Sequence, residues 1–354
     1  MLFILNLLFS SVSAINPSDY PAIDVVPAGN PAWTQAILKD VKVPAAIIGS
    51  CKLEDNWALT YDDGPSPFTD TALSALSSHQ YKGTFFAVGS RVKQRPELLL
   101  KAYQQGHQIA IHTWSHPDLI KLTDDQIVAE IVWTARIIKD VIGVTPSVVR
   151  PPFGSVDDRV QRLLTNMGLT TVSWNRDTND WMFAEYTPGK VMSAPFQPTD
   201  TPSAIPKLFE TWVKGPKVGS ISLQHDLYEI PSQQISPSLD ALAKSSYKVR
   251  TVAECIDIKP YDNPLLDRIS GIPPPPAPTT SLLPPKPTST ILIVTSTTAI
   301  VKPTGTVSPT TTAKPPTTTT TSARNRYETS VPISSSSKTL PALFGMYFIL
   351  TSLI

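Results

Sequence analysis

Residues able to bind a metal and move protons gather in a few short stretches of this 354-residue chain. The stretch from Thr60 to Pro65 holds two adjacent carboxylates, Asp62 and Asp63, directly before a Gly-Pro turn. Adjacent side chains point in different directions, so one carboxylate can bind a metal while the other faces a substrate. Taken alone, an ordinary acidic turn would explain this stretch equally well.

Two histidines, His112 and His116, are spaced four residues apart. This spacing predicts that they lie on one face of a helical turn, where they can chelate one ion. With a carboxylate as the third ligand, one coordination position stays open for water, which is typical of catalytic rather than structural zinc sites. His79 and His107 have no comparable polar cluster nearby, so we expect them to be structural.

Three further stretches carry polar residues that are weak signals when taken singly. Arg150 precedes two prolines and Phe153; it can fix a carboxylate through paired hydrogen bonds, and the stiff loop can present a backbone N–H to a developing oxyanion. The other two stretches are residues 177–181 and 223–226. An Arg, Asp or His near the end of a strand is more often structural than catalytic.

The elements that must position these stretches follow from the apolar pattern of residues 50–258. Short apolar runs alternate there with amphipathic stretches, which predicts an α/β fold with largely parallel strands and a barrel-like shape. Each polar stretch directly follows or ends a predicted strand, as chemistry in such barrels requires. The expected strands are 57–61, 83–88, 108–111, 147–150, 169–174, 218–223 and 248–252, and the expected helices are 69–78, 96–106 and one after the capping box of Thr123 and Gln126.

The two ends of the chain differ in composition from its middle. Residues 1–14 are predicted to be a signal peptide, because they form an uncharged apolar run that ends in a small-x-small pattern and is too short to span a membrane. Residues 259–329 are predicted to be a Pro/Thr/Ser-rich, O-glycosylated linker without fixed structure. Residues 330–354 match a GPI-attachment signal with an apolar tail, the alternative being a short single-span anchor. The leader, residues 15–49, is either flexible or wrapped over the barrel.

Charge and cysteine content limit the partners and the compartment. The chain has 30 basic and 29 acidic residues, a net charge of +1, so no basic surface indicates nucleic acid or anionic lipid and we expect a neutral partner. The two cysteines, Cys51 and Cys255, lie near the two ends of the predicted domain. In an oxidising compartment they are expected to form one disulfide, and two free buried thiols are the alternative.

Taken in order, the five polar stretches resemble those of the carbohydrate esterase family 4 polysaccharide deacetylases, whose shared core is the NodB homology domain. Within that family the chain is most similar to fungal chitin deacetylases, which often combine the domain with a signal peptide and a Ser/Thr-rich GPI-anchored tail. The resemblance covers residues 50–258 and implies a distorted (β/α) barrel with fewer than eight repeats.

The resemblance also implies roles for individual residues. Asp62 corresponds to the general base, and Arg150 is expected to orient it. The implied metal ligands are Asp63, His112 and His116.

On the other side of the implied site, His225 corresponds to the general acid. Asp180 is expected to support it, with Asp177 as a second candidate. The backbone N–H of Phe153 would donate to the oxyanion, although the family more often has Tyr there. Trp181 and Leu223 would wall the acetyl pocket.

The implied activity is metal-dependent removal of acetyl groups from N-acetylglucosamine units of chitin, with Zn²⁺ or Co²⁺ as the cofactor. We expect a monomer at the cell surface, anchored in the membrane through its GPI lipid. Deacetylation of xylan or peptidoglycan is the enzymatic alternative. An inactive cell-wall-binding protein is a third possibility, which the presence of all the implied metal ligands and of the base disfavours.

Overall fold

The computed structural model describes residues 15–40 and 42–271. The predicted signal peptide (1–14), the linker from residue 272 onward and the predicted GPI signal (330–354) lie outside the described residues. None of the helices in the described part is long and apolar enough to cross a membrane.

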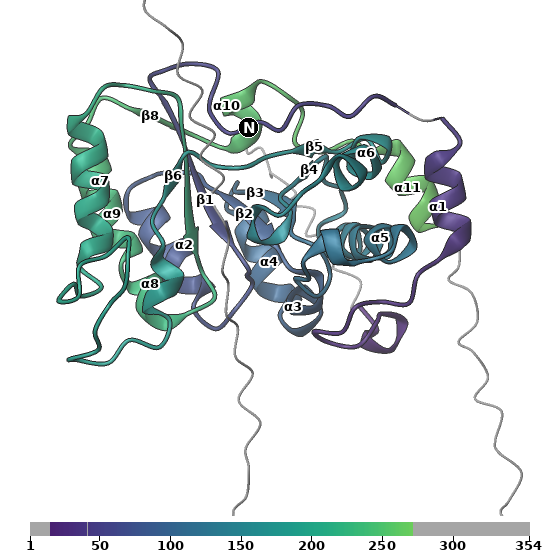
Figure 1. Ribbon diagram of the computed structural model, residues 1–354, viewed down its shortest axis with the longest axis horizontal. Coiled ribbons are helices and arrows are strands. Elements are labelled where there is room, and N and C mark those ends of the chain that lie inside the picture. The colour runs from purple at the N-terminus through teal and green to yellow at the C-terminus, as the bar shows by residue number, and fades with distance from the viewer. Residues whose placement is uncertain (1–14, 41, 272–354) are drawn as a thin grey trace, which may run out of the picture. The chain divides into compact units, whose positions relative to one another are not determined.

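Eight parallel strands form one curled sheet at the centre of the described region (Figure 1). Their order across the sheet is β5-β4-β3-β2-β1-β7-β6, and β8 also pairs with β1. The strands are β1 (Asn56–Asp62), β2 (Thr84–Ala87), β3 (Gln108–Ile111), β4 (Val148–Val149), β5 (Thr170–Thr171), β6 (Arg176–Asp177), β7 (Ser220–His225) and β8 (Lys248–Arg250).

A single segment of chain, residues 170–177, joins the two edges of this sheet. It pairs with β4 at its start, as β5, and with β7 at its end, as β6. The sheet therefore curls into a distorted barrel, and the predicted fold class is confirmed. The sequence pattern missed β6, because the two residues of this strand are both polar.

Helices surround the strands, with α7 and α9 on the left of Figure 1 and α5, α11 and α1 on the right. The long helix α5 begins with the predicted capping box of Thr123 and Gln126 and ends before Gly143, which has a φ of 83° that favours glycine. The helices are α1 (Pro31–Leu38), α2 (Thr69–Ser78), α3 (Gly89–Gln94), α4 (Pro96–Gln104), α5 (Asp124–Ile142), α6 (Asp158–Asn166), α7 (Ala204–Lys214), α8 (Glu229–Gln233), α9 (Ile235–Ala243), α10 (Val252–Ile256) and α11 (Pro264–Ser270). Short 3₁₀ turns are η1 (Pro17–Asp19), η2 (Leu119–Lys121), η3 (Pro152–Gly154) and η4 (Asp180–Phe183).

Alternation along the strands separates the packing core from the site. Successive strand residues point to opposite faces, so one face of each strand packs on the helices and the other points into the barrel. On β1 the inward series begins with Ala58, which belongs to a small buried apolar cluster, and continues through Thr60 to Asp62. The register pairs Asp62 with both Phe86 and His225. The strand ends therefore bring polar side chains together at one mouth of the barrel, above an apolar interior.

The opposite end of the barrel is closed by α10 and a disulfide. Cys51 and Cys255 are bonded and buried in the interior cluster, which confirms the predicted pairing. The expected strand 248–252 is shorter than predicted, because Thr251 and Glu254 form a capping box that starts α10 at Val252.

The leader, residues 15–49, wraps over the barrel, which is one of the two arrangements predicted for it. In Figure 1 its purple ribbon runs along the right side and over the top of the domain. Asn30 caps α1, whose Trp33 is fully buried, and α1 contacts α5 and α6. Tyr20 stacks on Trp114 with ring centroids 6.1 Å apart, and the Trp114 indole N–H donates to the Ala22 carbonyl at 2.9 Å.

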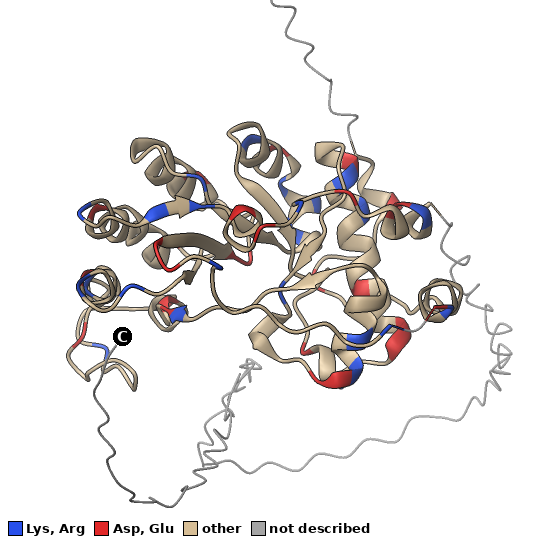
Figure 2. Cartoon of the chain, turned by 90° about the horizontal axis from the view of Figure 1, so that it is seen from above, with Lys and Arg blue, Asp and Glu red and all other residues tan. Residues whose placement is uncertain are grey.

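At the other end, the fold extends past the boundary expected at residue 258. Asn263 caps α11 by accepting a hydrogen bond from the N–H of Leu266. Leu266 and Ile269 are fully buried, and α11 contacts α5. We did not predict this helix because its residues were assigned to the Pro/Thr/Ser-rich linker, although an Asn-Pro pair is a helix-start signal. Charged residues of both signs are interspersed along the chain in Figure 2, as the balanced composition predicts.

Candidate active site

Asp62 and Asp63 end the first strand and diverge there. Asp62 is the last residue of β1, and Asp63 has a left-handed backbone with a φ of 78°. Both side chains are buried. The turn sends Asp63 toward the two histidines, whereas Asp62 accepts a hydrogen bond from Arg150.

The histidines converge by a route that differs from the prediction. Residues 112–116 form a loop rather than a helical turn, because Thr113 and His116 have positive φ values of 67° and 57°. The Thr113 hydroxyl accepts a hydrogen bond from the His116 N–H at 3.1 Å. His112 Nδ1 lies 2.7 Å from the Arg150 carbonyl, which fixes the ring and leaves Nε2 facing Asp63.

The three donor atoms fit one divalent ion. Asp63 Oδ1 lies 3.3 Å from His112 Nε2 and 3.2 Å from His116 Nε2, and the three ligand atoms fall within 4.8 Å of one another. Ligands of a tetrahedral zinc site, with bonds of about 2.0–2.2 Å, lie about 3.3–3.6 Å apart. Burial alone would raise the pKa of Asp63, but the charge of His116 and the imidazole hydrogen bonds hold it well below its ordinary value. The site is therefore suited to a divalent metal.

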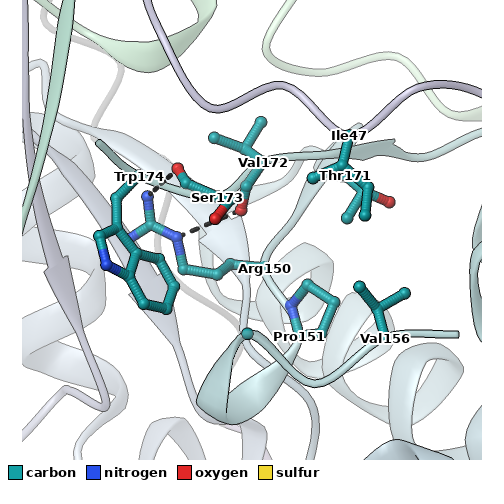
Figure 3. A pocket seen from close by; sticks show the side chains of 9 residues that line it. Ile47, Arg150, Pro151, Val156, Thr171, Val172, Ser173 and Trp174 are labelled. Carbon is teal, nitrogen blue, oxygen red and sulfur yellow. Dashed lines mark hydrogen bonds between the residues drawn. The ribbon is translucent and has the colours of Figure 1, made fainter. Parts of the chain in front are cut away.

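Arg150 holds Asp62 from inside the barrel. Its Nη1 donates to Asp62 Oδ1 and to the Thr60 hydroxyl, both at 2.7 Å. Figure 3 shows its other hydrogen bonds, from Nε to the Val172 carbonyl and from Nη2 to the Ser173 carbonyl. Arg150 is fully buried, so these contacts fix the Asp62 carboxylate in one orientation. Thr60 was not predicted, although its inward position two residues before Asp62 follows from strand alternation.

Asp177 does not contact His225 and instead supports the Arg150 side of the site. Its carboxylate accepts a hydrogen bond from the Trp174 indole N–H at 3.0 Å. The Trp174 ring lies 5.4 Å from the Arg150 guanidinium and lines a cavity of about 60 Å³ beside it (Figure 3). Of the two candidate partners for His225, the geometry therefore favours Asp180.

His225 ends β7 and is held by Asp180 through two hydrogen bonds. Its Nδ1 lies 2.6 Å from Asp180 Oδ1, and its backbone N–H donates to Asp180 Oδ2 at 2.8 Å. Burial lowers the pKa of His225, but the charge and hydrogen bond of Asp180, with smaller contributions from Asp63 and Asp62, raise it to about 10. The register places the imidazole beside Asp62 on the neighbouring strand. The site thus pairs a carboxylate oriented by Arg150 with an imidazole whose pKa is raised by Asp180.

The remaining predicted residues lie on the turns and strand ends around this mouth. Phe153 has a left-handed backbone with a φ of 61°, and its ring meets His116 edge-on at 4.7 Å. Trp181 is 47% exposed in η4, next to Asp180. Leu223 is buried on β7, and its carbonyl accepts a hydrogen bond from the Thr178 hydroxyl at 2.6 Å.

The chain matches the family model of polysaccharide deacetylase over residues 49–172, a range that contains the Asp pair, both histidines and Arg150. It is also 37% identical to chitin deacetylase 1 of Cryptococcus neoformans var. grubii over 291 residues, which cover 69% of this chain and 60% of that protein. The chain therefore contains a polysaccharide deacetylase domain.

The names of other similar proteins state two different substrates, chitin and peptidoglycan. Over 134 residues the chain is 40% identical to a chitin deacetylase of Amylomyces rouxii, covering 38% of this chain and 32% of that protein. Over 234 residues it is 30% identical to the peptidoglycan-N-acetylglucosamine deacetylase PgdA of Listeria monocytogenes, covering 65% of this chain and 44% of that protein. The chain spans less than two thirds of the length of these curated relatives.

Among solved structures, the chitin deacetylase of Colletotrichum lindemuthianum superposes with a TM-score of 0.54 at 25% identity. The superposition covers 63% of this chain and 97% of that protein. The superposed part of this chain therefore corresponds to nearly the whole of that structure.

Proposed function

We propose that this protein hydrolyses N-acetyl groups of N-acetylglucosamine units in chitin, giving chitosan and acetate. The observation that carries the proposal is the convergence of three side chains able to hold a metal, a carboxylate oriented by Arg150 and an imidazole bonded to Asp180 at one mouth of the barrel. The triad is Asp63, His112 and His116. Asp62 and His225 are the last residues of neighbouring paired strands.

The metal that Asp63, His112 and His116 would hold is Zn²⁺ or Co²⁺, since both accept nitrogen and oxygen ligands. Such an ion polarises a carbonyl and lowers the pKa of bound water from about 15.7 toward 7. Asp62 is the general base in this proposal. Arg150 holds its Oδ1 at 2.7 Å, so the other carboxylate oxygen is left to take a proton from the attacking water.

His225 is the general acid in the proposal. An amine leaves an amide poorly unless it is protonated, and the Asp180 contact keeps a proton on His225 at neutral pH. The backbone N–H of Phe153 is proposed to donate to the oxyanion. Trp181 and Leu223 are proposed to wall the acetyl group.

Chitin is the proposed substrate because chitin deacetylases of three fungi are among the similar proteins. The Pro/Thr/Ser-rich composition of the predicted linker and the apolar C-terminal tail also favour a protein of the fungal cell wall. We propose a secreted monomer that is carried on the predicted linker and a GPI anchor at the cell surface, where chitin of the wall is within reach. Similarity to the Listeria enzyme makes peptidoglycan the second candidate substrate.

Acetate release by the secreted protein tests the proposal. Purified protein is incubated with chitin oligomers, acetylated xylan or peptidoglycan, with and without a chelator, beside an Asp62→Asn variant. We expect release from chitin oligomers that the chelator abolishes and that Asp62→Asn lacks. Acetate release from peptidoglycan alone would replace chitin by peptidoglycan as the proposed substrate. Metal-bound protein that releases acetate from none of the three polymers would contradict the proposed activity.

A further inference from the structure

Glu130 is a fully buried carboxylate on α5, a helix whose other buried residues are almost all apolar. A carboxylate in such a position is costly unless strong hydrogen-bond donors surround it. No Lys, Arg or His forms an ion pair with it among the described residues. Its contacts must therefore explain why the helix carries an acid there.

All three hydrogen bonds to the Glu130 carboxylate come from the residues between the two histidines. Its Oε2 accepts from the backbone N–H of Trp114 at 2.6 Å and of Ser115 at 2.8 Å. Its Oε1 accepts from the Ser115 hydroxyl at 2.6 Å. Both carboxylate oxygens are thus directed at the spacer of the His112–His116 loop.

The His112–His116 loop depends on the Glu130 carboxylate as an acceptor because its backbone N–H groups are not bonded within a helix or a strand. Thr113 and His116 are left-handed, so the chain between them can form neither a helical turn nor a strand. The N–H groups of Gly89 and Ser90 bond the carbonyls of Thr113 and Trp114, each at 2.9 Å. The carbonyls of Thr113 and Trp114 are therefore satisfied by the start of α3, and the N–H groups of Trp114 and Ser115 are satisfied by Glu130.

We propose that Glu130 is a positioning residue that holds the His112–His116 spacing and so sets the affinity of the metal site. The inference rests on the proposed metal triad, since Glu130 touches neither the ligand atoms nor the substrate. Partners of metal ligands beyond the coordination shell typically change metal affinity 10–100-fold when they are removed.

Glu130→Gln is the test variant, because it keeps the size of the side chain and one acceptor oxygen. Its single oxygen is a neutral and therefore weaker acceptor for the two backbone N–H groups, and its NH₂ can only donate, so the Ser115 hydroxyl loses its acceptor. The matched control is Glu254→Gln, since Glu254 likewise accepts from a backbone N–H and a hydroxyl, both of Thr251, but lies on α10 at the closed end of the barrel. Ser115→Ala is a milder variant that removes only the hydroxyl donor.

The measurement is the dissociation constant of Co²⁺ or Zn²⁺ by chelator competition on metal-free, folded protein, together with the visible spectrum of the cobalt form. We expect affinity to fall roughly 10–100-fold in Glu130→Gln, by a smaller factor in Ser115→Ala, and not at all in Glu254→Gln. An altered cobalt spectrum would show displaced ligands, which loss of stability alone would not produce.

Wild-type affinity and spectrum in Glu130→Gln would overturn the inference and leave the proposed function intact. If Glu130→Gln does not fold, Ser115→Ala decides in the same way, and wild-type affinity in that variant overturns the inference. A wild-type protein that binds neither metal would overturn both this inference and the metal triad on which it rests.

Discussion

The two halves of the active-site mouth are built in different ways. The metal half, Asp63 with the His112–His116 loop, consists of turns that contain three left-handed residues. The acid half places His225 at the end of β7, in register with β1, and bonds it to the buried Asp180. Strand pairing fixes the backbone of His225 and Asp180 holds its ring, whereas the His112–His116 loop of the metal half is held by side chains of α5 and of the leader. We therefore expect the two halves to respond differently to substitution.

The largest effect is expected from Asp63→Asn, which removes the proposed anionic ligand of the metal half. The activity should fall by about 10⁴-fold or more, because the metal contributes several kcal/mol to the transition state. Metal content and acetate release, measured on the same preparation, should fall together. Full metal occupancy in this variant would contradict the assignment of Asp63.

His225→Asn should break the acid half and leave the metal half intact. The expected loss of rate is about 10²–10³-fold, since general acid catalysis typically contributes 10²–10⁴-fold. Metal affinity should match that of the wild type, which chelator competition would check. A parallel loss of metal would show that the two halves are not separable.

Asp180→Asn should shift the pH profile rather than remove a reacting group. The pKa of His225 is raised to about 10 chiefly by Asp180, working against burial. Loss of that charge lowers the pKa, so the imidazole loses its proton at a lower pH and the alkaline limb of the rate profile moves downward. An unchanged alkaline limb, measured from pH 5 to 11, would exclude His225 as the titrating acid.

The smallest effect on chemistry is expected from Tyr20→Ala, which weakens the support of the metal half from the leader. Tyr20 stacks on Trp114 and hydrogen-bonds Asp140. Its truncation should cost about 3–5 kcal/mol in the free energy of unfolding, the range for buried aromatic residues, and should lower metal affinity severalfold. Denaturant unfolding and chelator competition would measure the two effects. Reduced stability with unchanged metal affinity would limit the leader to a role in folding.

Much of this site follows from the sequence, and the parts that do not have physical reasons. Strand alternation and the spacing of Asp62, His112 and Arg150 place their side chains at strand ends. The prediction of a helical turn for the histidines was wrong because Thr113 and His116 adopt left-handed backbones. Glycine or asparagine would have indicated such a backbone in the sequence, and neither stands at these positions.

Glu130 was not singled out from the sequence, since an acid within an apolar helix face shows no partner until the fold is known. Asp177 was the second candidate for support of His225, and only the structure pairs it with Trp174. The leader has no motif that predicts its contacts, and the stacking of Tyr20 on Trp114 joins residues 94 positions apart.

The closed end of the barrel bears on the order of events at the proposed site. Val252, Cys255 and Ile256 are buried in the interior cluster, and the disulfide ties α10 to the chain before β1. With this end closed, we expect that in the proposed reaction the acetyl group enters and acetate leaves through the same mouth of the barrel. The next sugar unit can be bound productively only after the previous acetate has left. Acetate is therefore expected to act as a product inhibitor that competes with the acetylated substrate.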